Sequence, residues 1–80
     1  MRKVIVYTQE GCRPCTEEKY WLKENGIEFE ERNIRENPTF LDEIFELGAS
    51  ATPATVIEDG NGKEVILGFD QDRLVEVLAL

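Results

Sequence analysis

The fold of this chain is decided by one stretch near its start, Val4-Ile5-Val6-Tyr7-Thr8-Gln9-Glu10-Gly11-Cys12-Arg13-Pro14-Cys15. The β-branched and aromatic residues Lys3–Thr8 are typical of a buried strand. A helix begins soon after Gly11, because Pro14 lacks a backbone N–H and suits the first helical position, where that group would have no partner. Good helix formers continue to Asn25, and Gly26 marks the end of the helix. The two cysteines therefore lie where a strand hands over to a helix.

The middle of the chain predicts a second strand and a second helix. Residues 27–34 alternate apolar and polar side chains, which is typical of a partly exposed strand. The acidic run at residues 28–31 most simply keeps that strand soluble and its edge unpaired. Asn37-Pro38 is typical of a helix cap followed by a first turn. Apolar residues then recur at helical spacing up to Gly48, so an amphipathic helix is expected there.

The last third of the chain predicts a β-hairpin and a closing helix. Residues 54–57 and 64–67 are rich in apolar side chains, and the turn sequence Asp59-Gly60-Asn61-Gly62 lies between them. Asp70 is expected to cap the final helix, with Phe69 and Leu74 packing around it as a hydrophobic staple. The inward stripe of that helix is expected to consist of Leu74, Val77 and Leu78.

The elements follow one another as strand, helix, strand, helix, strand, strand, helix. The first three form a right-handed parallel unit, and the hairpin must extend the same sheet antiparallel to hide its apolar face. We therefore expect an α/β fold in which three helices cover a mixed four-stranded sheet, in the order β-α-β-α-β-β-α. At 80 residues the chain has room for a single domain, residues 1–80, and not for two.

The chain is strongly acidic, which argues against several classes of partner. Its formal net charge is -8 and it contains no histidine. An anionic protein repels both a nucleic acid backbone and an anionic membrane surface. The apolar run at residues 4–7 is too short for a signal peptide or a membrane span. We expect a cytoplasmic protein that binds neither nucleic acid nor membrane.

The two cysteines are the strongest candidates for chemistry. A disulfide between cysteines three positions apart closes too short a loop to stabilise the fold much, so reactivity explains the pair better. The Cys12 sulfur should lie beside unpaired N–H groups at the positive end of the helix, which lowers its pKa by roughly one unit from ~8.5. Arg13 adds a positive charge nearby. We assign Cys12 as the nucleophile and Cys15 as the resolving thiol, which displaces a mixed disulfide on Cys12.

A close cysteine pair also occurs as half of a metal site, and this alternative stays open. Tetrahedral zinc needs four ligands, whereas the chain has no histidine and no third cysteine. No metal site is therefore expected within one chain. A dimer that shares ligands, or an iron-sulfur cluster held between two chains by Cys12 and outside thiols, would still meet the need.

Taken together, these motifs resemble the glutaredoxins and the related glutaredoxin-like redoxins. The resemblance covers nearly the whole chain and rests on Val4–Thr8, Gly11–Cys15, Asn25–Ile27, Thr52-Pro53 and Gly68–Asp70. It implies a minimal thioredoxin-like fold and a dithiol thiol-disulfide oxidoreductase. Such a protein reduces protein or low-molecular-weight disulfides and carries electrons in cell redox homeostasis. The resemblance further implies a cis-proline at Pro53 facing the cysteines, a Thr52 backbone that pairs with a thiol substrate, and no tightly bound cofactor, with glutathione as a candidate co-substrate.

The chain departs from glutaredoxins at positions that bind glutathione. Gln9 replaces the lysine that often attracts a glutathione carboxylate, and Pro14 precedes the second cysteine as in thioredoxins. The segment Gly68-Phe69-Asp70 resembles the Ser-Gly-Phe stretch of redoxins that serve ribonucleotide reductase. Its glycine and aspartate either hold the amino-acid end of a tripeptide thiol or form a turn and a helix cap. The candidate substrate-binding residues are Arg13, Thr52, Pro53, Gly68 and Asp70.

The same resemblance suggests partners for this protein. Some residues of the first helix are given structural roles instead. We expect a monomer that acts on disulfide-bearing proteins, ribonucleotide reductase among them. A flavoprotein of the thioredoxin-reductase type is slightly favoured over glutathione as electron donor, because the acidic surface disfavours a small anionic thiol. Glu18 is interpreted as a solvated carboxylate rather than as a proton acceptor for Cys15, and Tyr20 and Trp21 as surface and packing residues.

Overall fold

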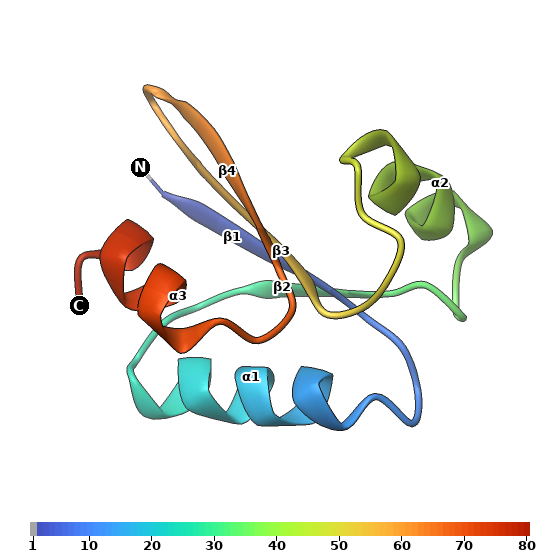
Figure 1. Ribbon diagram of the computed structural model, residues 1–80, viewed down its shortest axis with the longest axis horizontal. Helices are drawn as coiled ribbons and strands as arrows, with labels where there is room; N and C mark the ends of the chain where they lie inside the picture. Colours follow the sequence, from blue (N-terminus) through green and yellow to red (C-terminus); the bar gives the residue numbers. More distant parts are fainter. Residues whose placement is uncertain (1) are drawn as a thin grey trace.

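A mixed sheet of four strands separates two helical layers in the computed structural model, which describes residues 2–80 (Figure 1). The elements are, in chain order, β1 (Lys3–Thr8), α1 (Arg13–Glu24), β2 (Glu30–Asn33), α2 (Pro38–Glu46), β3 (Ala54–Asp59), β4 (Gly62–Leu67) and α3 (Gln71–Leu78). Helices α1 and α3 cover one face of the sheet, and α2 covers the other. The α/β class and the element order expected from the sequence are confirmed.

The strands lie in the order β2-β1-β3-β4. β1 runs parallel to β2, with Val6 opposite Glu31, and antiparallel to β3, with Ile5 opposite Val56. β3 and β4 form the predicted antiparallel hairpin. The central strands β1 and β3 are buried over most of their length, whereas β2 and β4 form the two edges. The acidic β2 is thus an edge strand, as its charges indicated.

The bounds of four elements differ from the sequence prediction. β2 spans only Glu30–Asn33 instead of residues 27–34, because it pairs with β1 only over that length. Helix α1 begins one residue earlier than predicted, because Cys12 already fills the cap position. The hairpin strands run on to Asp59 and Gly62, which pair with each other and leave a two-residue turn.

Alternation along the strands gives the sheet two separate apolar layers. The buried residues of the layer under α1 and α3, the α1 layer, are Val4, Val6, Leu22, Ile57, Ile66, Leu74 and Leu78. Those of the layer under α2, the α2 layer, are Ile5, Tyr7, Ile44, Ala49, Ala54 and Val56. The predicted inward stripe of α3 is confirmed at Leu74 and Leu78, while Val77 packs at the margin of the α1 layer and is only partly buried.

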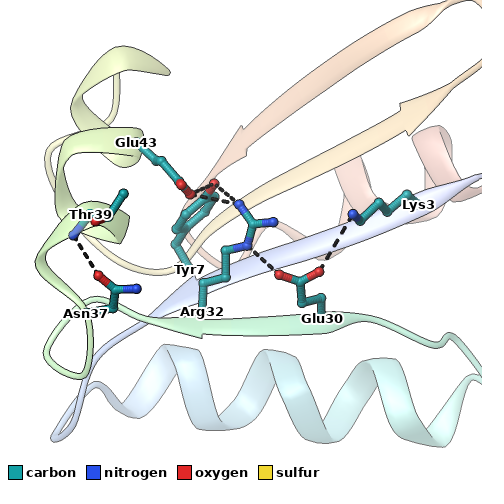
Figure 2. A network of polar contacts seen from close by, with 7 residues as sticks. All are labelled: Lys3, Tyr7, Glu30, Arg32, Asn37, Thr39 and Glu43. Carbon is teal, nitrogen blue, oxygen red and sulfur yellow. Dashed lines mark hydrogen bonds and ion pairs between the residues drawn. The ribbon is translucent and has the colours of Figure 1, made fainter.

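On the α2 face, a polar network joins β1, β2 and α2 (Figure 2). Arg32 donates from Nη1 to Glu43 Oε1 at 2.7 Å and to the Tyr7 hydroxyl oxygen at 3.2 Å. Tyr7 in turn donates its hydroxyl hydrogen to Glu43 at 2.8 Å. Burial, and then the bond to Glu43, raises the pKa of Tyr7. Charged groups therefore hold α2 to the sheet in addition to its apolar contacts.

One carboxylate, Glu18, lies inside the α1 layer. Its exposed fraction is 0%, so the interpretation of Glu18 as a solvated carboxylate is wrong. The cause is its spacing, since Glu18 lies between Cys15 and Leu22 on the inward side of α1, where all three residues are buried. The Thr55 hydroxyl on β3 donates a hydrogen bond to Glu18 Oε2. Burial raises the pKa of Glu18 to about 7, and the bond from Thr55 opposes that rise.

Replacing Glu18 with glutamine should change how stability depends on pH. The pKa of Glu18 rises from 4.5 to about 7 on folding, so the folded chain holds this proton more tightly than the unfolded chain does. The resulting stabilisation is fully present below the unfolded pKa and is lost as pH rises through the folded pKa. Between about pH 5 and pH 9, the wild-type protein should therefore lose roughly 2 to 3 kcal/mol of unfolding free energy relative to Glu18→Gln.

Denaturant unfolding of the oxidised proteins at the two pH values measures this difference. Glu24→Gln is the matched control, because it makes the same change at an exposed position of the same helix. Its stability should follow that of the wild type at both pH values. Parallel behaviour of Glu18→Gln and the wild type would mean that Glu18 titrates normally.

Candidate active site

Cys12 forms the N-cap of α1 and presents its sulfur to the start of the helix. Its backbone is extended, with φ of -90° and ψ of 101°, and the N–H of Cys15 donates to Cys12 Sγ at 3.2 Å. Gly11, at φ of 77°, makes the left-handed turn that brings the chain from β1 into this position. The sulfur thus lies at the positive end of the helix dipole, where the sequence predicted it, and a thiolate there would be stabilised.

Cys12 and Cys15 are joined by a disulfide, with their Cα atoms 5.2 Å apart. The two sulfurs differ in access, because Cys15 is only 1% exposed whereas Cys12 is partly exposed. An attacking thiolate from solvent therefore reaches Cys12 more readily than Cys15. This asymmetry agrees with the nucleophile and resolving roles expected for the pair.

The loop before β3 is held against the end of β1. Gln9 donates from its side-chain amide to Thr52 Oγ1 at 3.0 Å, which fixes the Thr52 side chain. The Thr52-Pro53 peptide bond is cis, as the family resemblance implied, and Pro53 is buried. Sequence reasoning missed the bond from Gln9, because it joins residues 43 positions apart and neither side chain signals the other.

A backbone contact connects this loop to the start of α3. The N–H of Gly68 donates to the carbonyl of Pro53 at 2.9 Å. Gly68 has φ of 75°, a conformation that suits glycine. Asp70 then caps α3, with its Oδ1 accepting from the N–H of Arg73 at 3.1 Å. Of the two interpretations of Gly68 and Asp70, the turn and helix cap are present.

Arg13 extends into solvent beside the cysteines. Its side chain is 89% exposed and forms an ion pair with Glu17, one turn along α1, at 3.3 Å. Because this carboxylate offsets part of the guanidinium charge, Arg13 adds less to the stability of a Cys12 thiolate than its sequence position suggested. The N–H of Cys15, in the first turn of α1, donates directly to the Cys12 sulfur.

An apolar groove of about 400 Å³ lies between α1 and the start of α3. The residues that line it are Thr16, Glu17, Tyr20, Trp21, Glu24, Phe69 and Gln71. Two of them, Trp21 and Phe69, form an edge-to-face pair with ring centroids 6.1 Å apart. Tyr20 is 66% exposed, which confirms its surface position, and Trp21 packs against the α1 layer as expected.

Within residues 2–80, no three histidine, cysteine, aspartate or glutamate side chains come together as a metal site would require. An iron-sulfur cluster held between two chains would therefore need Cys12 together with ligands from outside this chain. Separately, none of the helices in the described part of the chain has the length and apolar character needed to cross a membrane.

Comparison with known proteins agrees with this geometry. The glutaredoxin family model matches residues 4–62. The glutaredoxin-like protein NrdH of Lactococcus lactis is 39% identical over 56 residues, which cover 70% of this chain and 78% of that protein. The solved structure of the thioredoxin-like protein BC3987, in its T8A mutant form, aligns with a TM-score of 0.83 at 31% identity, over 95% of this chain and 99% of the other.

A third relative supports the fold alone. The NrdH-redoxin of Escherichia coli aligns with a TM-score of 0.77 at 23% identity, covering 94% of this chain and 93% of that one. The matched family region contains residues 4–8 of β1, both cysteines, the cis-proline loop and all of β3. With the fold, the helix-capping cysteine and this match in agreement, the chain belongs to the glutaredoxin family, as a redox protein with a thioredoxin fold and a Cys-X-X-Cys pair.

Proposed function

We propose that this protein is a small dithiol oxidoreductase that reduces protein or low-molecular-weight disulfides and carries electrons for cell redox homeostasis. One observation carries the proposal: a partly exposed Cys12 sulfur at a helix N-terminus is bonded to a buried Cys15. A disulfide that only stabilised the fold would not need this difference in exposure. An exchange reaction does, because one sulfur must contact the substrate, and the other attacks only after the mixed disulfide has formed.

The proposed cycle moves two electrons between the cysteines and a substrate disulfide. In the reduced protein, the Cys12 thiolate attacks one substrate sulfur, a mixed disulfide forms, and the other substrate sulfur leaves as a thiolate. Cys15 then attacks Cys12, the mixed disulfide breaks, and the second substrate thiolate departs. The Cys12-Cys15 disulfide holds the oxidised state. The cycle needs no resident cofactor, because the two thiols themselves store the electrons.

The electron donor that we propose is a flavoprotein of the thioredoxin-reductase type, placed slightly above glutathione. Gln9 is neutral and already donates to Thr52, so it offers no cation to a glutathione carboxylate. Asp70, which caps α3, adds a negative charge two residues after the Gly68 contact with this loop. With a net charge of -8, both features disfavour an anionic tripeptide. The backbone of Thr52 remains the proposed contact for a thiol substrate.

The proposed setting follows from the same features. The homologue NrdH and the Gly68-Phe69 stretch favour disulfide-bearing protein substrates, with ribonucleotide reductase as the leading candidate. We propose that the protein acts as a monomer in the cytoplasm, where reduced donors are abundant.

Substitution of each cysteine should separate the two steps of the cycle. Cys15→Ser should accumulate a mixed disulfide on Cys12 when it is offered an oxidised substrate, because the resolving thiol is gone. Cys12→Ser should show no disulfide reductase activity, because the buried Cys15 cannot meet a substrate. Mass spectrometry of the trapped adduct locates it, and the Cys12→Ser, Cys15→Ser double variant shows the background. Full activity of Cys12→Ser would refute the cycle.

A comparison of two electron donors tests the proposed reductant. At equal pH and ionic strength, turnover with thioredoxin reductase should exceed turnover with glutathione and glutathione reductase. Gln9→Lys should raise the glutathione rate, because it restores a cation near the site. Asn61→Lys makes the same charge change in the distant hairpin turn and should leave the ratio of the two rates unchanged. Efficient glutathione turnover, with none from the flavoprotein, would reverse the ranking.

A further inference from the structure

The buried carboxyl of Glu18 lies one helical turn beyond Cys15, on the same side of α1. Residues three positions apart on a helix have Cβ atoms about 5–6 Å apart. Both side chains are withdrawn from solvent, with exposed fractions of 0% for Glu18 and 1% for Cys15. In the reduced protein, the thiol of Cys15 would therefore face the same closed space as this carboxyl.

Glu18 keeps one oxygen unused. Its Oε2 accepts a hydrogen bond from the Thr55 hydroxyl, whereas Oε1 has no hydrogen-bond partner within residues 2–80. It is also the one buried side-chain oxygen or nitrogen in that range without a partner. An unsatisfied buried oxygen costs stability, and an apolar side chain would fill an inward position of α1 without that cost. Such a group is a candidate for a chemical role.

Charged groups on the surrounding elements are engaged elsewhere. Lys19, the next residue of α1, pairs with Glu31 of β2 at 2.8 Å, and Glu31 also accepts from Thr8 of β1 at 2.7 Å. On α3, Arg73 pairs with Glu64 of β4 at 2.8 Å and with Glu76 at 3.0 Å, while Asp70 caps the helix. Tyr7 and Arg32 belong to the opposite face of the sheet. Thr55 of β3 carries no charge.

We propose that Glu18 is the proton acceptor for the Cys15 thiol in the resolving step. This inference rests on the proposed dithiol cycle. The Glu18 carboxylate removes the proton from Cys15 Sγ, and the resulting thiolate attacks Cys12. The Cys12-Cys15 bond forms, the bond from Cys12 to the substrate breaks, and the substrate leaves as a thiolate. When a donor thiolate later opens the disulfide at Cys12, Cys15 leaves as a thiolate and recovers the proton from Glu18.

The acidity of Glu18 suits this exchange. Burial brings its pKa to about 7, so that the carboxyl is ionised in part of the population near neutral pH. An acceptor whose pKa lies near the working pH is the efficient case for proton transfer. An ordinary exposed glutamate, ionised but far weaker as a base, would take a thiol proton less well.

A stopped-flow reaction of the reduced protein with excess 5,5′-dithiobis(2-nitrobenzoate) tests the proposal. The first release of thionitrobenzoate reports attack by Cys12, and the second reports resolution by Cys15. The reagent concentration is raised until the first release outruns the second. Glu18→Gln should slow the second release at least about tenfold near pH 7, within the range of general-base effects, and remove the pH inflection near the pKa of Glu18. Its first release should match the wild type.

Two further variants complete the test. Glu36→Gln, in the exposed turn before α2, should match the wild type in both releases. Thr55→Val removes the hydrogen bond that holds down the pKa of Glu18, so the inflection of the second release should move to higher pH. This shift decides the question if Glu18→Gln fails to fold, and an unmoved inflection would overturn the proposal.

The readouts separate the possible failures. Two results with Glu18→Gln would overturn the proposal. An unchanged second release would mean that Glu18 has no role in resolution. An equal slowing of both releases would mean that its role is structural. Failure of the wild-type protein to give any second release would instead refute the dithiol cycle itself.

Discussion

The hydrogen bond from the Cys15 N–H to the Cys12 sulfur is the contact on which the rest of the site depends. This bond makes Cys12 the N-cap of α1, directly after the loop that follows β1. One side chain therefore serves both as helix cap and as reactive group. A serine or aspartate would cap as well but could not exchange a disulfide. The capping position of α1 is therefore occupied by the reactive residue. The helix dipole stabilises a thiolate at that sulfur without the need for further charged residues.

The remainder of the site consists of segments that are brought to this cap from distant parts of the chain. Gln9 holds the side chain of Thr52, and the carbonyl of Pro53 holds the backbone of Gly68. These two bonds connect the end of β1, the loop before β3 and the start of α3. The apolar groove beside α1 adds Trp21 and Phe69 next to the same region. The Cys12 N–H donates to the Gln9 carbonyl at 3.3 Å, and this bond connects the three segments to the cysteine cap.

Local patterns in the sequence were sufficient for most of the fold. β1, the hairpin and the caps at Asn37 and Asp70 depend on neighbouring residues, and each is present, with the hairpin strands longer than the pattern indicated. The cysteine pair was likewise recognisable, because strand, glycine and proline surround it within a few positions. The exact span of β2 was not, since its length is set by pairing with β1.

Features that depend on distant partners were not predictable. Glutamate is usually a surface residue. Only the fold shows that the hydroxyl of Thr55, 37 positions away, donates a hydrogen bond to Glu18 in the core. Gln9 was interpreted as the absence of a lysine, while its actual contact is with Thr52. In both cases composition gave the polar side chain no inward or bridging role. Helical spacing sets Glu18 on the inward side of α1, but it does not reveal the partner Thr55 on β3.

The pairing of Glu18 with Thr55 also guards the register of the sheet. In β3, Thr55 faces the α1 layer, whereas its neighbours Ala54 and Val56 face the α2 layer. A slip of one residue between β1 and β3 would exchange these faces and set an apolar side chain against the Glu18 carboxyl. A sheet in the shifted register would then bury a carboxyl with neither oxygen hydrogen-bonded. Glu18 lowers the stability of the native fold, but it lowers the stability of these misaligned arrangements more.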